Sequence, residues 1–219
     1  MKQFRQFLTE EISRDTKSVT DLLVDEVYSR YIDIHNKNSI ECVGWLDGNE
    51  NYLIRMQKIY EAGIGNNDSV LDVGCGVAHL HTFLSNQGWS GKYLGVDPNK
   101  KAIDLVDEGI NVMEGTIEDL DELAEWNRFD WAISSGVFNL GLKEEHVFFI
   151  IENMISHANK GIVFNMLHAP YEDPNYEAYY PKHIKNKLNR YDHSKIEIVE
   201  DYMPKDEEFT VYFLSLIHI

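Results

Sequence analysis

A glycine turn between two apolar runs is the feature that most constrains how this chain folds. The run Val70-Leu71-Asp72-Val73-Gly74-Cys75-Gly76 ends in glycines, and a second run, Leu94-Gly95-Val96-Asp97, ends in a carboxylate. This order predicts a strand, a turn, a helix and a second strand. Glycines let a ligand contact the backbone, and the N–H groups at the start of the helix point to the same place. Because the carboxylate of Asp97 can accept both hydroxyls of a ribose, the pattern predicts a nucleoside-binding site.

The turn differs from the one that binds dinucleotides. That version uses three glycines, so that a pyrophosphate can sit on the helix N-terminus. Here Gly76 is followed by Val77, Ala78 and His79, with no third glycine. We therefore expect an uncharged or zwitterionic nucleoside.

From residue 69 onward, strand-like and helix-like patterns alternate, which is typical of a parallel sheet in an α/β fold. The run 209–217 is continuously apolar and is expected inside the sheet, whereas 195–200 alternates apolar and charged residues and is expected at its edge. The expected strands are 69–73, 92–96, 111–114, 129–135, 161–167, 195–200 and 209–217, and the expected helices are about 77–87, 99–109, 118–126, 143–158 and 179–190.

The first 62 residues are predicted to be a mostly helical extension, because apolar residues recur there at three- and four-residue steps. A polar stretch, 33–39, leads to Val43-Gly44-Trp45 and is expected to be an ordered loop. We predict that residues 1–62 form a lid that excludes water, and that residues 63–219 form the main domain.

Charge and composition favour some partners over others. The chain has 37 acidic and 20 basic residues, a formal net charge of −17, which disfavours binding to bulk DNA or RNA. Four permanent cations gather in Lys182–Arg190, here called the basic segment. We interpret the basic segment as a solvated helix face, and a docking surface for nucleic acid is the alternative.

Metal and membrane binding are not predicted. Cys42 and Cys75 have no metal-ligand spacing, and His79 and His81 do not share a helix face or have a third ligand nearby. Cys75, between two glycines, is expected to fill space under the turn. No run is long enough for a signal peptide or a membrane span, so a soluble, cytoplasmic protein with reduced cysteines is expected.

The first motif resembles that of the class I S-adenosylmethionine-dependent methyltransferases, an apolar strand followed by D-x-G-x-G. Two further features follow in that family's order, Gly115-Thr116-Ile117-Glu118-Asp119 and Phe129-Asp130-Trp131-Ala132-Ile133-Ser134-Ser135-Gly136. Much of 31–214 also resembles small bacterial and bacteriophage methyltransferases of unassigned substrate. The resemblance implies a Rossmann-like doubly wound sheet, mostly parallel with a C-terminal antiparallel hairpin, in the strand order 3-2-1-4-5-7-6.

The resemblance also implies a cofactor, S-adenosyl-L-methionine, which becomes S-adenosyl-L-homocysteine. It places Asp72 and the glycines at the methionine end, Asp97 on the ribose and Thr116-Ile117 beside the adenine. Asp119 is instead expected to cap a helix together with Thr116. The expected cofactor-binding residues are Trp45, Asp72, Gly74, Gly76, Asp97, Pro98, Thr116, Ile117 and Ser135.

Methyl transfer requires an acceptor aligned with the S–CH₃ bond and a route for any surplus proton. Methyltransferases that modify amino groups of nucleic-acid bases carry Asp/Asn-Pro-Pro-Tyr/Phe after the fourth strand, and this chain has Ser134-Ser135-Gly136-Val137-Phe138-Asn139 there. This departure disfavours N-methylation of adenine or cytosine, although Phe138 could stack on a flat acceptor and Asn139 could hydrogen-bond it. The expected catalytic residues are Asn139, Asn165 and, as a base, His168, for which a surface or packing role is the alternative. Tyr171, Tyr176, Tyr179 and Tyr180 are expected around the same mouth.

The predicted function is transfer of a methyl group to an oxygen or nitrogen of a small-to-medium acceptor. Two alternatives are a nucleic-acid methyltransferase that docks through the basic segment and a non-catalytic module that binds S-adenosylmethionine.

Overall fold

The computed structural model describes residues 29–37, 39–44, 48–122, 128–171, 176–203 and 207–216, with residues 121 and 122 as backbone only. Most of the predicted extension and Trp45 lie outside the described residues, and the division into 1–62 and 63–219 stays a prediction. The described strands are β1 Val70–Val73, β2 Tyr93–Asp97, β3 Val112–Glu114, β4 Phe129–Ser134, β5 Ala158–Leu167, β6 Lys195–Val199 and β7 Glu208–Leu214. The described helices are α3 Asn49–Tyr60, α4 His79–Asn86, α5 Lys100–Leu105, α6 Glu144–His157 and α7 Pro181–Leu188, with 3₁₀-helices η1 Ile40–Val43, η2 Ile117–Glu122 and η4 Val137–Asn139; residues 29–34 are also helical.

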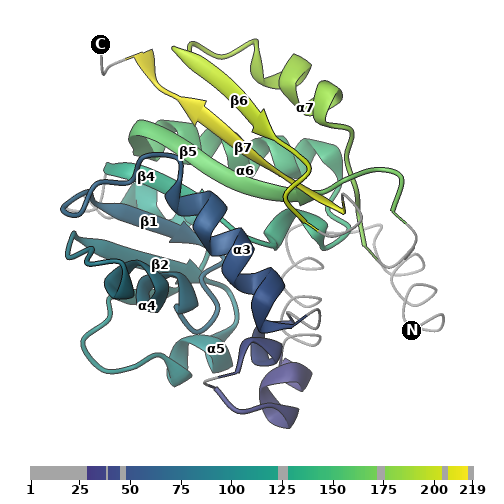
Figure 1. Cartoon of the computed structure of the whole chain (residues 1–219). Coiled ribbons are helices and arrows are strands. Elements are labelled where there is room, and N and C mark those ends of the chain that lie inside the picture. The colour runs from purple at the N-terminus through teal and green to yellow at the C-terminus, as the bar shows by residue number, and fades with distance from the viewer. Residues whose placement is uncertain are drawn as a thin grey trace.

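The seven strands form one sheet in the order β3-β2-β1-β4-β5-β7-β6, which confirms the predicted order (Figure 1). The pairs from β3 across to β5 are parallel, and β7 is antiparallel to both β5 and β6. The apolar β7 lies inside the sheet and the half-charged β6 lies at its edge, as predicted. The carboxyl ends of the parallel strands therefore lie along one edge, the place where such sheets bind ligands.

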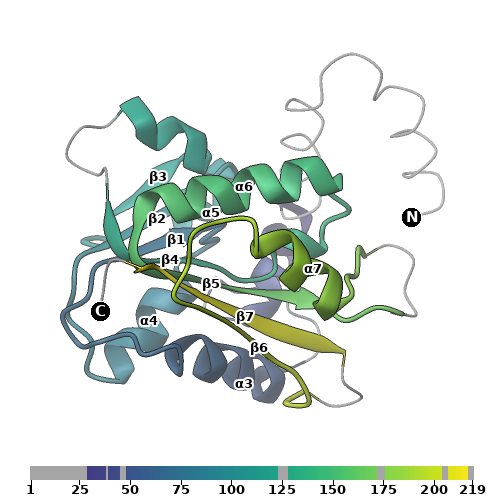
Figure 2. The ribbon, with the colours of Figure 1, turned by 90° about the horizontal axis from the view of Figure 1, so that it is seen from above.

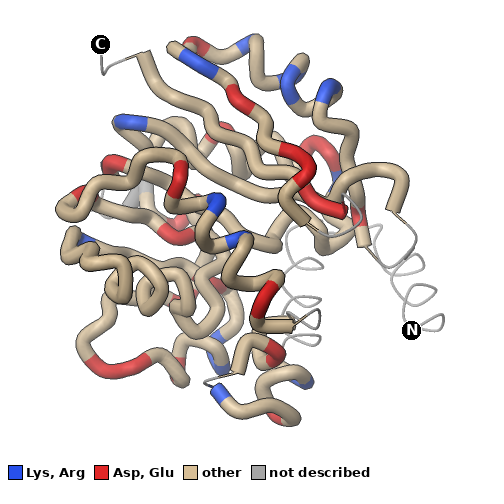
Figure 3. The backbone as a smooth tube through the Cα atoms, in the orientation of Figure 1, with Lys and Arg blue, Asp and Glu red and all other residues tan. Residues whose placement is uncertain are grey.

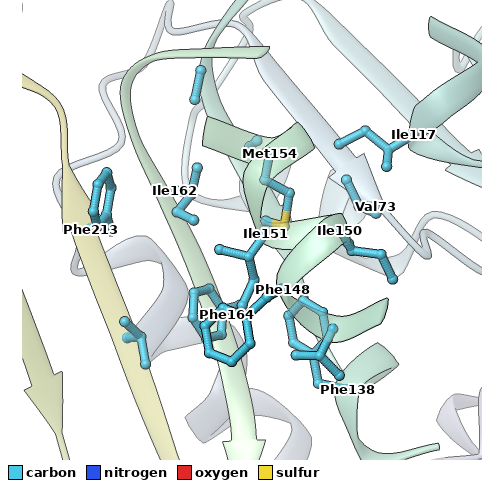
Figure 4. Packing of buried hydrophobic residues seen from close by; sticks show 14 of the residues in the cluster. Val73, Ile117, Phe138, Phe148, Ile150, Ile151, Met154, Ile162, Phe164 and Phe213 are labelled. Carbon is cyan, nitrogen blue, oxygen red and sulfur yellow. The ribbon is translucent and has the colours of Figure 1, made fainter. Parts of the chain in front are cut away.

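Two hydrophobic layers cover the sheet. Helices α3 and α4 lie on one face, and α6 and α7 lie on the other (Figure 2). Neighbouring strand residues belong to opposite layers: Val70 packs with the α3–α4 layer and Leu71 with the α6–α7 layer. In the second layer, Ile151 and Met154 of α6 pack against Ile162 of β5 (Figure 4).

Three elements are shorter or tighter than predicted. Helix α4 begins at His79 because Ala78 before it is left-handed, with φ 61°. Helix α5 ends at Leu105 because Val106 is extended, with ψ 140°. In place of the α-helix expected at 118–126, the described part forms the 3₁₀-helix η2.

The basic segment packs partly against α6. The Lys187 ammonium lies 2.7 Å from Glu144 Oε1, and an Arg190 guanidinium nitrogen lies 3.3 Å from Glu152 Oε1. Both cations also lie over the Phe148 ring, at 5.6 Å and 5.4 Å from its centre. Figure 3 shows basic residues gathered on α7, while acidic residues are spread over the described backbone. Two of the four permanent cations of the segment are therefore engaged within the chain.

No helix in the described part of the chain is long and apolar enough to cross a membrane.

Candidate active site

One cavity of about 190 Å³ opens where β1, β2 and β4 end. Residues of the N-terminal part, Ile32, Val43 and Gly44, line it together with residues of the sheet edge. Of the predicted cofactor-binding residues, those that line it are Asp72, Gly74, Gly76, Asp97, Pro98, Thr116, Ile117 and Ser135; Trp45 lies outside the described residues. The structure thus brings the predicted residues from four separate segments into one cavity.

The two glycines of the turn are needed for its shape. Gly74 has φ +76°, and a Cβ there would lie 2.2 Å from Val137 Cγ2. Gly76 has φ +54°, and a Cβ there would lie 2.7 Å from Val43 Cγ1. Both the left-handed backbone and the close neighbours exclude larger residues. The turn therefore presents bare backbone to the cavity, which fits a ligand that contacts it closely.

Asp97 ends β2 with its carboxylate fixed in place. One carboxylate oxygen accepts the Gly76 N–H at 2.8 Å, and the other accepts the Asn99 N–H at 2.8 Å. Burial raises the pKa of Asp97, and these two N–H donors oppose the shift. The side chain lines the cavity with its remaining lone pairs free of the turn's N–H groups, so it has the acceptor capacity that a ribose diol requires.

Asp72 is the second buried acid of the cavity. The Tyr93 hydroxyl donates to its Oδ2 at 2.7 Å. Burial raises the pKa of Asp72 to about 7; the Tyr93 hydrogen bond lowers it and the charge of Asp97 raises it further. A cationic group in the cavity would relieve this desolvation by favouring the ionised carboxylate. The two acids therefore suit a ligand with a positive charge and hydroxyl groups.

The segment after β3 has the predicted cap. Asp119 Oδ2 accepts the Thr116 N–H at 2.7 Å and the Thr116 hydroxyl at 3.1 Å, which confirms a structural role for Asp119. The cap holds Thr116 and the buried Ile117 at the cavity wall.

Cys75 is a packing residue, as predicted. A Cβ at Gly95 of β2 would lie 2.6 Å from its Sγ, so the thiol fills the space that this glycine leaves. Burial raises the pKa of the Cys75 thiol well above its usual range, so the group is neutral.

The loop after β4 meets the predictions in part. Asn139 lines the cavity, and its Oδ1 accepts the Leu167 N–H at 3.0 Å. The stacking role predicted for Phe138 is wrong: its ring is fully buried and packs edge-on against Phe164 with centroids 5.3 Å apart (Figure 4). Gly136, left-handed at φ 86°, turns the chain so that the ring enters the core.

The structure does not bring the other two predicted catalytic residues to the cavity wall. His168 Nε2 lies 3.2 Å from Glu200 Oε1, and its ring meets Phe209 edge-on at 6.0 Å. Asn165 is fully buried behind the wall, where it accepts the Gly136 N–H at 2.9 Å. In their place His146 of α6 lines the cavity, together with Tyr176, one of the predicted tyrosines. Sequence reasoning missed His146, whose one signal is its position in the first turns of the helix after β4.

The fold and the cavity define an α/β protein with a cavity at the carboxyl ends of its parallel strands. A family profile described as a methyltransferase domain matches residues 64–208. The chain therefore belongs to the methyltransferase domain family. It is an S-adenosylmethionine-dependent methyltransferase, and S-adenosyl-L-methionine is its cofactor, as predicted.

Solved structures share the fold at low sequence identity. The N-methyltransferase NodS from Bradyrhizobium japonicum WM9, in complex with S-adenosyl-L-homocysteine, is 14% identical, with a TM-score of 0.68 over 88% of this chain and 98% of that one. Magnesium protoporphyrin IX methyltransferase from Synechocystis PCC 6803 is 14% identical, with a TM-score of 0.64 over 91% and 99%. A SAM dependent methyltransferase from Archaeoglobus fulgidus is 16% identical, with a TM-score of 0.61 over 77% and 96%. A search of curated proteins finds no significant match.

Proposed function

We propose that the chain transfers the methyl group of S-adenosylmethionine to an oxygen or nitrogen of a small-to-medium acceptor in this cavity. The observation that carries the proposal is the pair of buried carboxylates, Asp72 and Asp97, beside a glycine turn that no Cβ can enter. When bound, the cofactor supplies an electrophilic methyl group on a sulfonium.

The residues present fit the cofactor. Asp97, fixed by two N–H groups, accepts the ribose hydroxyls, and Asp72 in its ionised form pairs with the ammonium of the methionine part. The backbone at Gly74 and Gly76 contacts the methionine part. Thr116 and Ile117 flank the adenine, with Pro98 and Ser135 completing the wall.

The acceptor enters from the side of α6 and the loop after β4. Asn139 is our candidate for holding the acceptor by a hydrogen bond, because it is the predicted catalytic residue that lines the cavity. We assign no proton-removing role to His168, since its ring lies at Glu200 and Phe209. His146 of α6 lines the cavity on the acceptor side. We propose that its imidazole takes up the proton if the acceptor releases one during methyl transfer. The proposal of a small-molecule acceptor agrees with two proteins that share this fold, the N-methyltransferase NodS and magnesium protoporphyrin IX methyltransferase.

Residues 29–37 and 39–44 support the proposed lid. Besides the cavity-lining residues among them, Lys37 Nζ lies 2.9 Å from Asp107, and Lys101 Nζ lies 3.0 Å from Asp33. These exposed ion pairs fasten the segment beside α5, so that it forms one wall of the cavity.

The first test is calorimetry with S-adenosyl-L-homocysteine on the intact protein, on Asp97→Ala and on Asp104→Ala. Asp104 is an exposed acid of α5 paired with Lys100, and its loss should leave affinity unchanged. Asp97→Ala removes the ribose acceptor, and hydrogen bonds to a charged group of about 1.5–3 kcal/mol predict an affinity lower by at least about tenfold. Absence of binding by the folded intact protein would refute the proposal. If the intact protein binds, the next experiment is a screen of acceptors with S-adenosylmethionine labelled in its methyl group.

A further inference from the structure

A polar cluster of hydrogen-bonded side chains lies behind the cavity wall and connects α3, β7 and the loop after β4. At its centre, the Asn165 amide makes three hydrogen bonds: Oδ1 accepts the Gly136 N–H at 2.9 Å, and Nδ2 donates to Ser135 Oγ at 3.2 Å and to Glu208 Oε1 at 3.1 Å. Ser135 and Gly136 both line the cavity, whereas Asn165 lies behind it. The wall of the cavity is therefore held from behind by one amide.

Glu208 determines which way that amide points. A carboxylate only accepts hydrogen bonds, so it requires the NH₂ side of Asn165 and leaves Oδ1 for the Gly136 N–H. If the amide were reversed, its NH₂ would face an N–H donor and its oxygen would face a carboxylate. The charge of Glu208 thus fixes the hydrogen bond that holds Gly136.

Glu208 is itself fixed by two further groups. Arg55 Nε of α3 lies 2.6 Å from its Oε2, and the Tyr202 hydroxyl donates to its Oε1 at 2.9 Å. The side chains of Arg55 and Glu208 are only 5% and 0% exposed. Because β7 is antiparallel, its first residue reaches the carboxyl end of β5, where Glu208 pairs with Leu167.

Such an arrangement has no advantage for stability alone. Removing two charges from water costs about as much as their attraction returns, and apolar residues of similar volume often stabilise a core as well or better. The hydrogen bonds instead fix the orientation of the groups that they join, and a cavity wall next to a reacting group requires a fixed orientation.

We propose that Asn165 and Glu208, held by Arg55, are positioning residues for methyl transfer, which act by fixing Ser135 and Gly136 in the cavity wall. The inference rests on the proposed function, because it assumes that the methyl group is transferred in this cavity. It also revises the role of Asn165, which acts from behind the wall and touches no substrate. A further consequence is that α3, which precedes the glycine strand, is coupled to the cavity through Arg55.

The test compares Glu208→Gln with a control at the other end of the sheet. Asp68, which precedes β1, also has a mostly buried carboxylate. Its Oδ2 accepts the Gly65 N–H at 2.9 Å and the Trp131 Nε1–H at 2.8 Å, and its Oδ1 forms an ion pair with Lys160 that Asp68→Asn breaks. Asp68→Asn therefore disturbs a comparable polar cluster that the cavity does not include. Because Glu208→Gln removes the carboxylate that faces the buried Arg55, a double variant, Arg55→Met with Glu208→Met, removes both charges.

The readout is the NMR resonance of the bound methyl group of ¹³C-methyl-labelled S-adenosylmethionine, with thermal melting and S-adenosyl-L-homocysteine affinity recorded alongside. We expect both Glu208 variants to shift this resonance, with affinity within about threefold of the native protein, and Asp68→Asn to lower the melting temperature without a shift. Once an acceptor is known, kcat should fall at least about tenfold in the double variant with KM little changed, as for an interaction made in the transition state.

A folded double variant with the native resonance overturns the inference, as does a shift of equal size in Asp68→Asn. Absence of cofactor binding by the native protein is a different result, since it overturns the proposed function itself.

Discussion

Cofactor affinity should depend on pH through Asp72. The pKa of this carboxyl is about 7 in the free protein because it is buried, and our proposal pairs its ionised form with a cationic ammonium. Binding therefore requires loss of the proton. With a pKa near 7, about nine-tenths of the carboxyl is ionised at pH 8 and about one-tenth at pH 6, so affinity should fall about tenfold between them, or about 1.4 kcal/mol.

Calorimetry with S-adenosyl-L-homocysteine measures this at pH 6, 7 and 8, in pairs of buffers with different ionisation enthalpies. At pH 6 the binding should release close to one proton from Asp72. Asp72→Asn, which keeps the shape but cannot ionise, is the control; it still contains Asp97, whose pKa is also raised by burial. A native protein with the same affinity at pH 6 and pH 8, or a variant with the same pH dependence as the native protein, would refute the reasoning.

A second variant should move the midpoint of the pH dependence of cofactor affinity. The Tyr93 hydroxyl favours the ionised form of Asp72, so Tyr93→Phe should raise the pKa of Asp72 and move the affinity curve to higher pH. If the midpoint moves to lower pH, the proposed cause of the shift is wrong.

The same shift has a consequence for folding. Because the pKa of Asp72 is raised from 3.8 to about 7, the folded state favours the protonated form. The stability that this proton contributes is present at low pH and is lost as pH rises from about 4 to about 7. The difference of about 3 pKa units corresponds to about 4 kcal/mol as an upper bound, so cofactor-free Asp72→Asn should be more stable than the native protein at pH 8.

Four further substitutions test other parts of the structure. Gly88→Ala, at φ +84° in open space, should cost about 1 kcal/mol without loss of affinity, whereas Gly74→Ala, which adds a clash at the cavity, should cost more and weaken S-adenosyl-L-homocysteine binding measured by calorimetry. Phe138→Ala should lower the free energy of unfolding in urea by about 3–5 kcal/mol, and a loss under about 1 kcal/mol would contradict its place in the core. Asp119→Ala should remove the cap on Thr116 and lower the melting temperature by about 2–4 °C, corresponding to about 1 kcal/mol; an unchanged melting temperature would argue against the cap.

Local chemistry explains why the residues that line the cavity around the glycine turn could be predicted. Three of these features can be recognised within a few residues of sequence. Gly74 must be left-handed, Asp97 ends a buried strand, and Thr116 is capped by the acid three residues later. The position of β7 inside the sheet could also be predicted, because its residues are apolar on both faces.

The acceptor side depends on contacts that no local pattern contains. Phe138 faces the core because Gly136 turns the chain. The sequence of residues 134–139 does not show whether the ring points to the core or to the cavity. His168 follows β5 directly, yet its ring is directed to Glu200 of the segment after β6. Arg55 and Glu208 are 153 residues apart in the sequence. The sequence of helix α3 does not distinguish a buried, paired arginine from an exposed one, because the pairing depends on where β7 lies in the sheet.

The position of β7 has a consequence for synthesis of the chain. This strand lies between β5 and β6 although it follows both in the sequence, so β5 keeps an open edge until residues 208–214 have been made. Open edges of this kind favour pairing with other chains, and contacts of long sequence separation form slowly. Since Glu208 also begins this strand, the polar cluster behind the cavity can assemble only after the ribosome has made residue 208. A nascent chain that ends before residue 208 can thus contain the glycine turn and Asp97, but it lacks the hydrogen bond from Asn165 to Glu208 that holds the cavity wall from behind.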